Sequence, residues 1–169
     1  MLVFKHSVSV FGFALCGLAA LPARAADTGQ DKAPPPYGEV VLVHSPPEIM
    51  TVQKLPNFVG ISGRTAGARH LSMNLVVIPP GARAEPHHHA GFESAVYVLQ
   101  GRVETRWGPN LEHSLVSEAG DFLFIPPNVP HQPINLSDVE PARAIVVRND
   151  PQEQEHVVTY DHRPVEDSK

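Results

Sequence analysis

Short runs of β-forming residues, separated by proline, glycine and asparagine, most restrict how this chain can fold. A Gly, Pro or Asn interrupts the sequence every eight to twelve residues, and no stretch keeps a helical period over three turns. The segments between these breaks are rich in Val, Ile, Tyr and Phe, and they cover residues 39–44, 70–78, 94–100, 102–107, 112–116, 121–125 and 143–149. We therefore predict an all-β sandwich or barrel, and a single one because the sequence has no internal repeat.

The alternation within these segments indicates which side chains are buried. In residues 102–107, Val103 and Thr105 alternate with charged side chains, which predicts one buried and one solvated face. Phe122 and Phe124 lie in another apolar segment and are expected to pack in the core.

Residues 1–25 have the composition of a secretory signal peptide. Lys5 precedes an apolar run over residues 8–21, and residues 23–25 (Ala-Arg-Ala) have the small-x-small form that signal peptidase cleaves. The apolar run is short and no stop-transfer segment follows it, so we expect no membrane span once the signal peptide is removed. An uncleaved N-terminal anchor is the alternative. The predicted location is the periplasm or the exterior of the cell.

Three further regions follow the signal peptide in the predicted organisation. Residues 26–38 are polar and proline-rich and are expected to form a flexible leader, residues 39–160 a single β domain, and residues 161–169 a tail. Cys16, the only cysteine of the sequence, is lost with the signal peptide, so the mature chain has no internal disulfide and no cysteine-ligated zinc. Two of the 13 Lys and Arg residues are lost as well, and the remaining 11 against 18 Asp and Glu argue against a nucleic-acid partner.

A run of three histidines in the sequence EPHHHAGFES suggests a metal site. Successive side chains of a strand point to opposite faces, so His87 and His89 would share one side and His88 would point to the other. Two imidazoles on one side of a strand are a simple way to hold a metal ion. Glu93 is a further candidate ligand close in sequence, and His131 is another because it directly follows a hydrophobic strand.

Together the two segments resemble the two sequence motifs of the cupin superfamily. The first motif, G-x5-HxH-x3,4-E-x6-G, is matched here by Gly81, His87, His89, Glu93 and Gly101. The second motif, G-x5-P-x-G-x2-H-x3-N, is matched by Gly120, Pro126, Asn128, His131 and Asn135. Eighteen residues separate the motifs, which suits a short cupin, and the motifs lie within residues 81–135. The resemblance implies a single cupin domain with the double-stranded β-helix or jelly-roll barrel of that family.

Two departures from the motifs affect the expected site. Asn128 stands in place of a glycine, and asparagine tolerates the left-handed backbone that such a turn needs. Seven residues, and not six, lie between Glu93 and Gly101. Counted forward from His89 the fourth ligand is Glu93, whereas counted back from Gly101 that position is Ser94. Either a one-residue bulge keeps Glu93 in the site, which we favour, or Glu93 turns away and the site has three histidines.

The resemblance implies that His87, His89, Glu93 and His131 bind a divalent metal ion. Glu93, if loosely held, would also act in catalysis by moving protons. The sequence leaves Fe, Mn, Zn, Cu and Ni open: a carboxylate suits iron or manganese, while metal acquired outside the cytoplasm favours the ions that bind nitrogen most strongly. A degenerate cupin that keeps the fold without the metal is the alternative.

The resemblance implies a metal-dependent enzyme that acts on a small molecule, foremost an oxidoreductase of dioxygenase type. A metal-dependent isomerase or lyase and a non-catalytic module that binds a metal or small ligand are the alternatives, and the fold does not decide among them. Cupin domains commonly pair through edge strands, so a homodimer is expected. The β-like residues 39–44 are a candidate for this contact.

Overall fold

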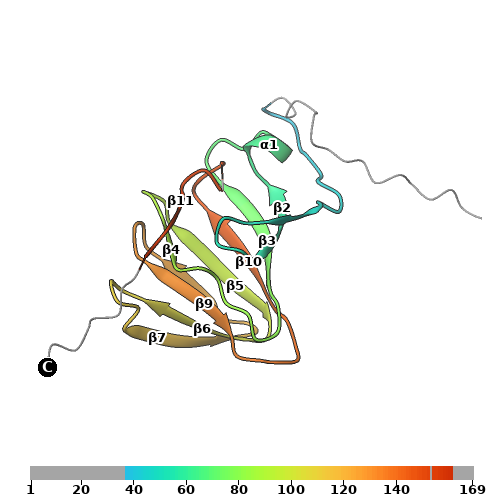
Figure 1. The fold of residues 1–169 in the computed structure, drawn as a ribbon. Helices are drawn as coiled ribbons and strands as arrows, with labels where there is room; N and C mark the ends of the chain where they lie inside the picture. The colour runs from blue at the N-terminus through green and yellow to red at the C-terminus, as the bar shows by residue number, and fades with distance from the viewer. Residues whose placement is uncertain (1–36, 153, 162–169) are drawn as a thin grey trace, which may run out of the picture.

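Two antiparallel sheets make up most of the protein in a computed structural model, which describes residues 37–152 and 154–161. The predicted signal peptide, nearly all of the predicted leader and all but the first residue of the predicted tail lie outside the described residues. Figure 1 shows the sheets facing each other, with β3, β10 and β5 in one and β9, β6 and β7 in the other.

The first sheet has six strands and the second has five. In spatial order the first sheet contains β1 (Glu48–Met50), β2 (Pro56–Ile61), β3 (Ser72–Ile78), β10 (Ala142–Arg148), β5 (Ser94–Gln100) and β8 (Phe122–Ile125). The second contains β11 (Val157–Thr159), β4 (His87–His89), β9 (His131–Asn135), β6 (Arg102–Trp107) and β7 (His113–Glu118). A single short helix, α1 (Gly63–Ala66), completes the described part of the chain. The all-β jelly-roll arrangement predicted from the sequence is confirmed.

The predicted strand over residues 39–44 is wrong. These residues adopt no strand or helix, Val40 is fully exposed, and Leu42 is largely exposed. The first strand of the described chain, β1, begins only at Glu48. β-forming composition stabilises a strand only where a neighbouring strand and a packed face are available, and no described strand pairs with this segment.

The prediction that Phe122 and Phe124 are buried is also wrong. Their exposed fractions are 83% and 59%, whereas Leu123 and Ile125 on the same edge strand line the interior. Both faces of β8 are apolar, so its sequence pattern does not reveal which face turns inward. The Phe122 ring instead lies on the outer face against Tyr97, with ring centroids 4.7 Å apart.

The packed core lies between the sheets and is small. Its buried members come from both sheets and from two loops: Leu55, Ile78, Ala84, Val103 and Ala142. The turn from β5 to β6 packs directly against this core, because a side chain added at Gly101 would meet the Cα and Cβ of Ala142 at 3.0 Å. Gly101 also has a positive φ of 86°, so glycine is required there on two grounds.

Asn135, the last residue of the second motif, fixes the loop that leads from β9 to β10. Its buried side-chain nitrogen lies 3.1 Å from the carbonyl oxygens of Ile78 and Pro79 and 2.7 Å from that of Glu140. Its Oδ1 accepts a hydrogen bond from the Ser137 backbone N–H at 3.0 Å. The side chain therefore replaces backbone pairing where two loops cross, which explains the need for an amide at this position.

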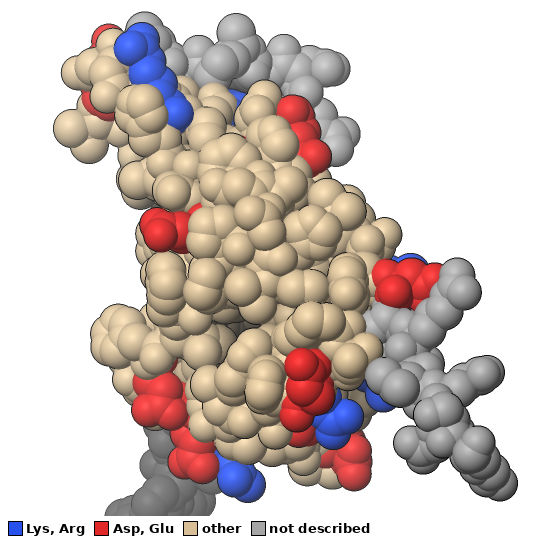
Figure 2. Space-filling view, turned by 90° about the vertical axis from the view of Figure 1, so that its left-hand side faces the viewer, with Lys and Arg blue, Asp and Glu red and all other residues tan. Residues whose placement is uncertain are grey.

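Charged side chains are sparse on the side of the molecule shown in Figure 2. They lie mainly toward the rim of this view, and uncharged residues cover its centre. Among the described residues no helix has the length and apolar character needed to span a membrane.

Candidate metal centre

Three histidines from two neighbouring strands meet inside the protein. His87 and His89 lie on β4, and His131 is the first residue of β9, where it pairs with His87 in register. Their exposed fractions are only 3%, 4% and 3%, and one ring nitrogen from each lies within 4.8 Å of the others. The strand pairing thus brings together histidines that lie more than forty residues apart in the sequence.

The alternation of a strand accounts for the orientation of the histidine run. The His87 and His89 rings lie 5.1 Å apart on the same side, as the sequence predicts. His88 points away from them, and its ring stands edge-on to Tyr160 at a centroid distance of 6.4 Å. It is therefore not a member of the cluster.

Hydrogen bonds to backbone carbonyls fix the tautomer of two of these histidines. Nδ1 of His87 lies 2.8 Å from the Glu85 carbonyl oxygen, and Nδ1 of His131 lies 2.9 Å from that of Val129. A carbonyl can only accept, so each Nδ1 carries the proton and donates it. Each Nε2 keeps a free lone pair, which is the arrangement that metal-binding histidines usually have.

His89 has a different environment from the other two. Nη2 of the buried Arg148 lies 3.0 Å from its Nε2, and Nε of the same guanidinium donates to Ser94 Oγ at 3.1 Å. An arginine can only donate, so this Nε2 accepts and the proton of the neutral ring lies on Nδ1. That Nδ1 is buried without a hydrogen-bond partner among the described residues.

Burial holds all three imidazoles in the neutral state. Desolvation is the largest cause, and it lowers the pKa of His87 to about 3 and that of His131 to about 4. The pKa of His89 is also lowered, first by desolvation and then by the positive charge of Arg148. Neutral imidazoles are the form that coordinates metals, so no proton has to leave these rings at neutral pH.

The donor set fits a divalent transition metal. Two free Nε2 lone pairs converge with the ring of His89, whose Nε2 accepts from Arg148, and all three rings are neutral and buried. Imidazole nitrogen suits Zn, Cu, Fe and Ni. Three protein ligands would leave further coordination positions open for water or substrate.

Glu93 lies outside this cluster. Its side chain is exposed, and its backbone N–H donates to Oδ1 of Asn149 at 2.8 Å. β5 begins at Ser94, whose side chain is buried and lines the cavity, so strand alternation turns the preceding residue outward. The residue that points inward is therefore Ser94, the position counted back from Gly101. The role of Glu93 as ligand and catalytic residue stays a prediction, and this arrangement does not favour it.

Asn128 occupies the turn in the way expected of a glycine substitute. Its φ is 62°, in the left-handed region. Its backbone N–H donates to the carbonyl of His89 at 3.0 Å, and its Oδ1 accepts from the backbone N–H of Gly91 at 2.9 Å. This asparagine therefore holds the end of β4, and with it the His89 side chain, against the loop that precedes His131.

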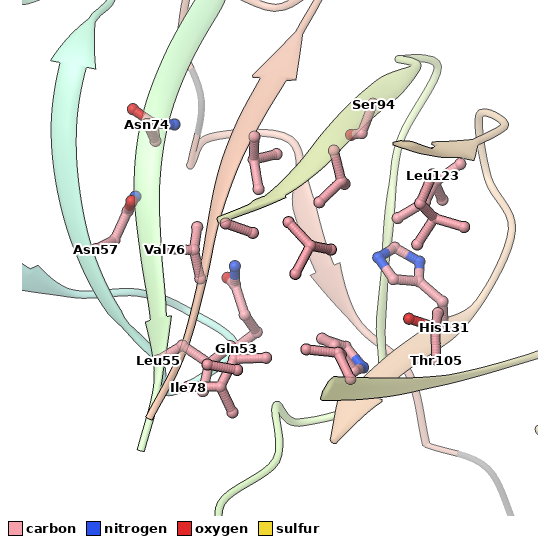
Figure 3. Close-up of a pocket in the computed structure, with 18 of the residues that line it drawn as sticks. Gln53, Leu55, Asn57, Asn74, Val76, Ile78, Ser94, Thr105, Leu123 and His131 are labelled. Atoms are coloured by element: carbon pink, nitrogen blue, oxygen red, sulfur yellow. The ribbon is translucent and has the colours of Figure 1, made fainter. Parts of the chain in front are cut away.

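A cavity between the two sheets gives access to the histidines. All three rings line it, together with mainly aliphatic walls from Leu55, Val76, Val96, Val98, Leu123 and Ile125. The cavity has a volume of about 90 Å³, which limits any ligand to a small molecule. Figure 3 shows His131 on one side of the cavity and Asn57 and Asn74 on the opposite side.

Sequence reasoning missed several polar residues that line this cavity. Arg148, Gln53, Asn57 and Asn74 are all buried and reach it from strands or loops outside the two motifs. The sequence pointed to these residues only through the presence of polar side chains within otherwise apolar β segments. Strand alternation shows that the two asparagines face inward only when the strand register is known.

We expect the metal-free protein to lose stability as the pH falls below about 6.5. Histidines of the unfolded chain bind protons near that pH, whereas His87 and His131 bind them only near 3 and 4. Protons then favour the unfolded state, so the stability is complete above pH 6.5 and is lost toward the folded pKa values. At pH 5 the loss is about 2 kcal/mol for each of these two histidines.

Urea unfolding at pH 7.5 and pH 5.0 measures this effect. Between pH 7.5 and pH 5.0, a variant with both His87→Gln and His131→Gln should lose about 4 kcal/mol less free energy of unfolding than the wild type. An equal loss in the variant and the wild type would show that other groups cause the acid sensitivity.

The comparisons with known proteins agree with the fold. Residues 74–148 match the family model described as a cupin domain, and this part of the chain is a cupin domain, as the two sequence motifs predict. Protein SchB of Streptomyces halstedii is 38% identical over 76 residues, which are 45% of this chain and 53% of SchB. The chain thus matches about half the length of this relative.

Solved structures share the fold at lower sequence identity. The oxalate decarboxylase of Lactobacillus farciminis, solved with formate, is 22% identical with a TM-score of 0.57, and the match covers 67% of this chain and 33% of that one. The polyketide cyclase RemF of Streptomyces resistomycificus is 23% identical with a TM-score of 0.53 over 69% of this chain and 75% of its own. A cupin 2 conserved barrel domain protein of Salinispora arenicola is 21% identical with a TM-score of 0.54 over 68% and 90%.

Proposed function

We propose that this protein is an exported cupin that binds one divalent metal ion through His87, His89 and His131 and acts on a small organic molecule. The observation that supports it most strongly is the convergence of three neutral, buried imidazoles on one wall of a cavity with aliphatic walls. Such a site has the room and the polarity for a small substrate next to an open coordination position. Glu93 is not needed as a ligand in this proposal.

The reaction type that we propose is oxidative, of the dioxygenase kind. A bound redox-active metal would supply Lewis acidity and electron transfer at this point of the cavity. The residues of the chain supply the surroundings: the aliphatic walls exclude water, and the carbonyls of Glu85 and Val129 hold two imidazoles in the coordinating tautomer. Ser94 orients the guanidinium of Arg148 beside the histidines, where it adds positive charge for an anionic oxygen of a substrate.

A site of three nitrogen ligands without a carboxylate bears on the choice of metal. Affinity for imidazole rises from manganese through iron and nickel to copper and falls again at zinc. Zinc in the site would favour isomerase or lyase chemistry, in which the metal only polarises an oxygen. Oxalate decarboxylase and a polyketide cyclase share the fold, so the fold itself is compatible with more than one reaction.

Reconstitution with single metals tests the proposal. The purified protein is loaded in turn with Fe, Mn, Zn, Cu and Ni, and metal content and dioxygen consumption are measured with a panel of small hydroxylated aromatic compounds. One tightly bound ion per chain and substrate-dependent consumption of dioxygen would support the oxidative proposal. Stoichiometric metal without any consumption would favour the isomerase, lyase or binding-module alternatives, and no metal uptake would overturn the proposal as a whole.

The same preparation tests export and assembly. We propose that export removes residues 1–25, so the intact mass of protein from the periplasm or medium should correspond to a chain that begins at Ala26. A full-length mass in a soluble cytoplasmic fraction would contradict export. We also propose that the protein is a homodimer, which sedimentation should show, and a monomer at micromolar concentration would contradict it.

A further inference from the structure

Three buried carboxamide side chains line the cavity away from the histidines. Asn57 on β2, Asn74 on β3 and Gln53 in the loop between β1 and β2 have exposed fractions of 1%, 4% and 6%. Figure 3 shows Asn57 and Asn74 on the β2 and β3 side of the cavity, with Gln53 between them and His131. The cavity therefore has a polar end besides the histidine cluster.

The side-chain oxygens of these three amides have no hydrogen-bond partner. Oε1 of Gln53 and Oδ1 of Asn57 and Asn74 are buried, and nothing in the described part of the chain donates to them. Rotation of an amide by 180° would bury its NH₂ group instead, so the need for a partner does not depend on how oxygen and nitrogen are assigned. Most buried polar groups in folded proteins are paired, and three unpaired amides around one cavity need an explanation.

The strand register shows that the two asparagines are placed where the fold accepts aliphatic residues. Asn57 is opposite Val76, and Asn74 is opposite Val59, so both asparagines lie on the same inward face of the β2–β3 pair as these valines. Valine or leucine at these positions would leave no unpaired polar atom. The asparagines therefore reduce stability in the absence of a partner, which is the pattern expected of binding residues.

We propose that Gln53, Asn57 and Asn74 form a second binding subsite that accepts hydrogen bonds from hydroxyl groups of the substrate. The inference rests on the proposed function, because it takes the cavity with the histidines as the substrate cavity. Aliphatic walls separate the two polar ends, so the ligand is a neutral or singly anionic ring compound: oxygen atoms face the histidines, the ring contacts the aliphatic walls, and a hydroxyl faces the amides. A charged ammonium group is disfavoured there, since neutral amides compensate a buried charge poorly.

Isosteric substitution separates this role from a structural one. Asn57→Leu and Asn74→Leu remove the unpaired oxygens and keep the branched shape of the side chain, so each should raise the melting temperature of the ligand-free protein by about 3 °C. Asn135→Leu is the matched control, because the side chain of that buried asparagine is fully paired and its loss should lower the melting temperature. A lower melting temperature in the Asn57 and Asn74 variants would show that these amides serve the fold and would overturn the proposal.

Binding of matched probes tests the recognition itself. With zinc-loaded protein, 4-hydroxybenzoate should bind at least about 10-fold more tightly than 4-methylbenzoate, which has the same shape and no donor at that end. The Asn57→Leu/Asn74→Leu double variant should lose this preference and keep its affinity for 4-methylbenzoate. Equal affinities of the two probes for the wild type, or an unchanged preference in the variant, would show that the amides hold only water and would contradict the subsite.

A second arm keeps the subsite distinguishable from the metal site. Phenol and toluene are compared by NMR titration of metal-free protein, where no ligand can coordinate. Preference for phenol that disappears in the double variant supports the subsite even if zinc fails to bind, whereas equal binding of both compounds overturns it. If the double variant does not fold, the Gln53→Leu variant is used in both binding experiments. Gln53 lies in a loop and not in a strand, so its substitution disturbs the sheet less.

Discussion

A variant with both His87→Ala and His131→Ala will bind zinc more than about 100-fold more weakly than the wild type. Removing the outer hydrogen-bond partner of a metal ligand already costs about 10–100-fold in affinity, so loss of two of three ligands costs more. The remaining imidazole, His89, is itself hydrogen-bonded to Arg148 and cannot hold the ion alone. Competition with a chromophoric chelator measures the affinity.

His88→Ala is the control that belongs with this variant. His88 lies on the same strand between two of the proposed ligands, but its side chain points away from the cluster. We expect its substitution to change zinc affinity less than about 3-fold, within the range of ordinary context effects on a site that keeps its ligands. Equal zinc affinity of the double variant and the His88 variant would show that the ion binds elsewhere.

Replacing Arg148 by methionine will raise zinc affinity by at least about 10-fold, or about 1.4 kcal/mol. Nε2 of His89 cannot accept the hydrogen bond from Arg148 and coordinate a metal ion at the same time. The guanidinium also repels a divalent ion placed among the three imidazoles, and this repulsion is strong in a buried site. Methionine fills a similar volume without charge or donor.

Arg148→Lys and Ser94→Ala serve as controls for this prediction. Lysine keeps the positive charge, so its zinc affinity should stay close to that of the wild type. Ser94→Ala removes the hydrogen bond that orients Arg148 and keeps the positive charge. Weaker zinc binding by a folded Arg148→Met protein would mean that the arginine supports the orientation of His89 and does not compete with the metal.

Local sequence pattern was sufficient for most of the strands and for the three histidines. The alternation in residues 102–107 matches β6 to the residue, and the apolar runs at 70–78 and 143–149 correspond to β3 and β10. His87, His89 and His131 were identifiable because strand alternation and the two motifs place them without knowledge of the distant pairings.

The position of Glu93 depended on a single residue of register. The distances to His89 and to Gly101 gave conflicting answers, and β5, which begins at Ser94, has the Ser94 side chain on its inward face. In a strand, a shift of one residue moves a side chain from the interior to solvent, so motif spacing alone could not settle this point.

Long-range pairing explains the remaining differences. Phe122 and Phe124 face outward because β8 pairs with β5 in a register that turns Leu123 and Ile125 inward. The amides of Asn57 and Asn74 reach the cavity only because β2 pairs with β3 and β3 pairs with β10 in the first sheet. Such pairings join residues far apart in the chain, and no local pattern encodes them.

The three-histidine site is tested most directly by long-range ¹H–¹⁵N correlation spectra of the histidine side chains, recorded at pH 7 with and without zinc. In metal-free protein we expect His87 and His131 to carry their proton on Nδ1, because each donates from that atom to a carbonyl. One equivalent of zinc should shift Nε2 of both residues and one ring nitrogen of His89 together, while His88 stays unchanged. Unshifted His87 and His131 signals after zinc addition, or a proton on their Nε2 atoms, would contradict the site.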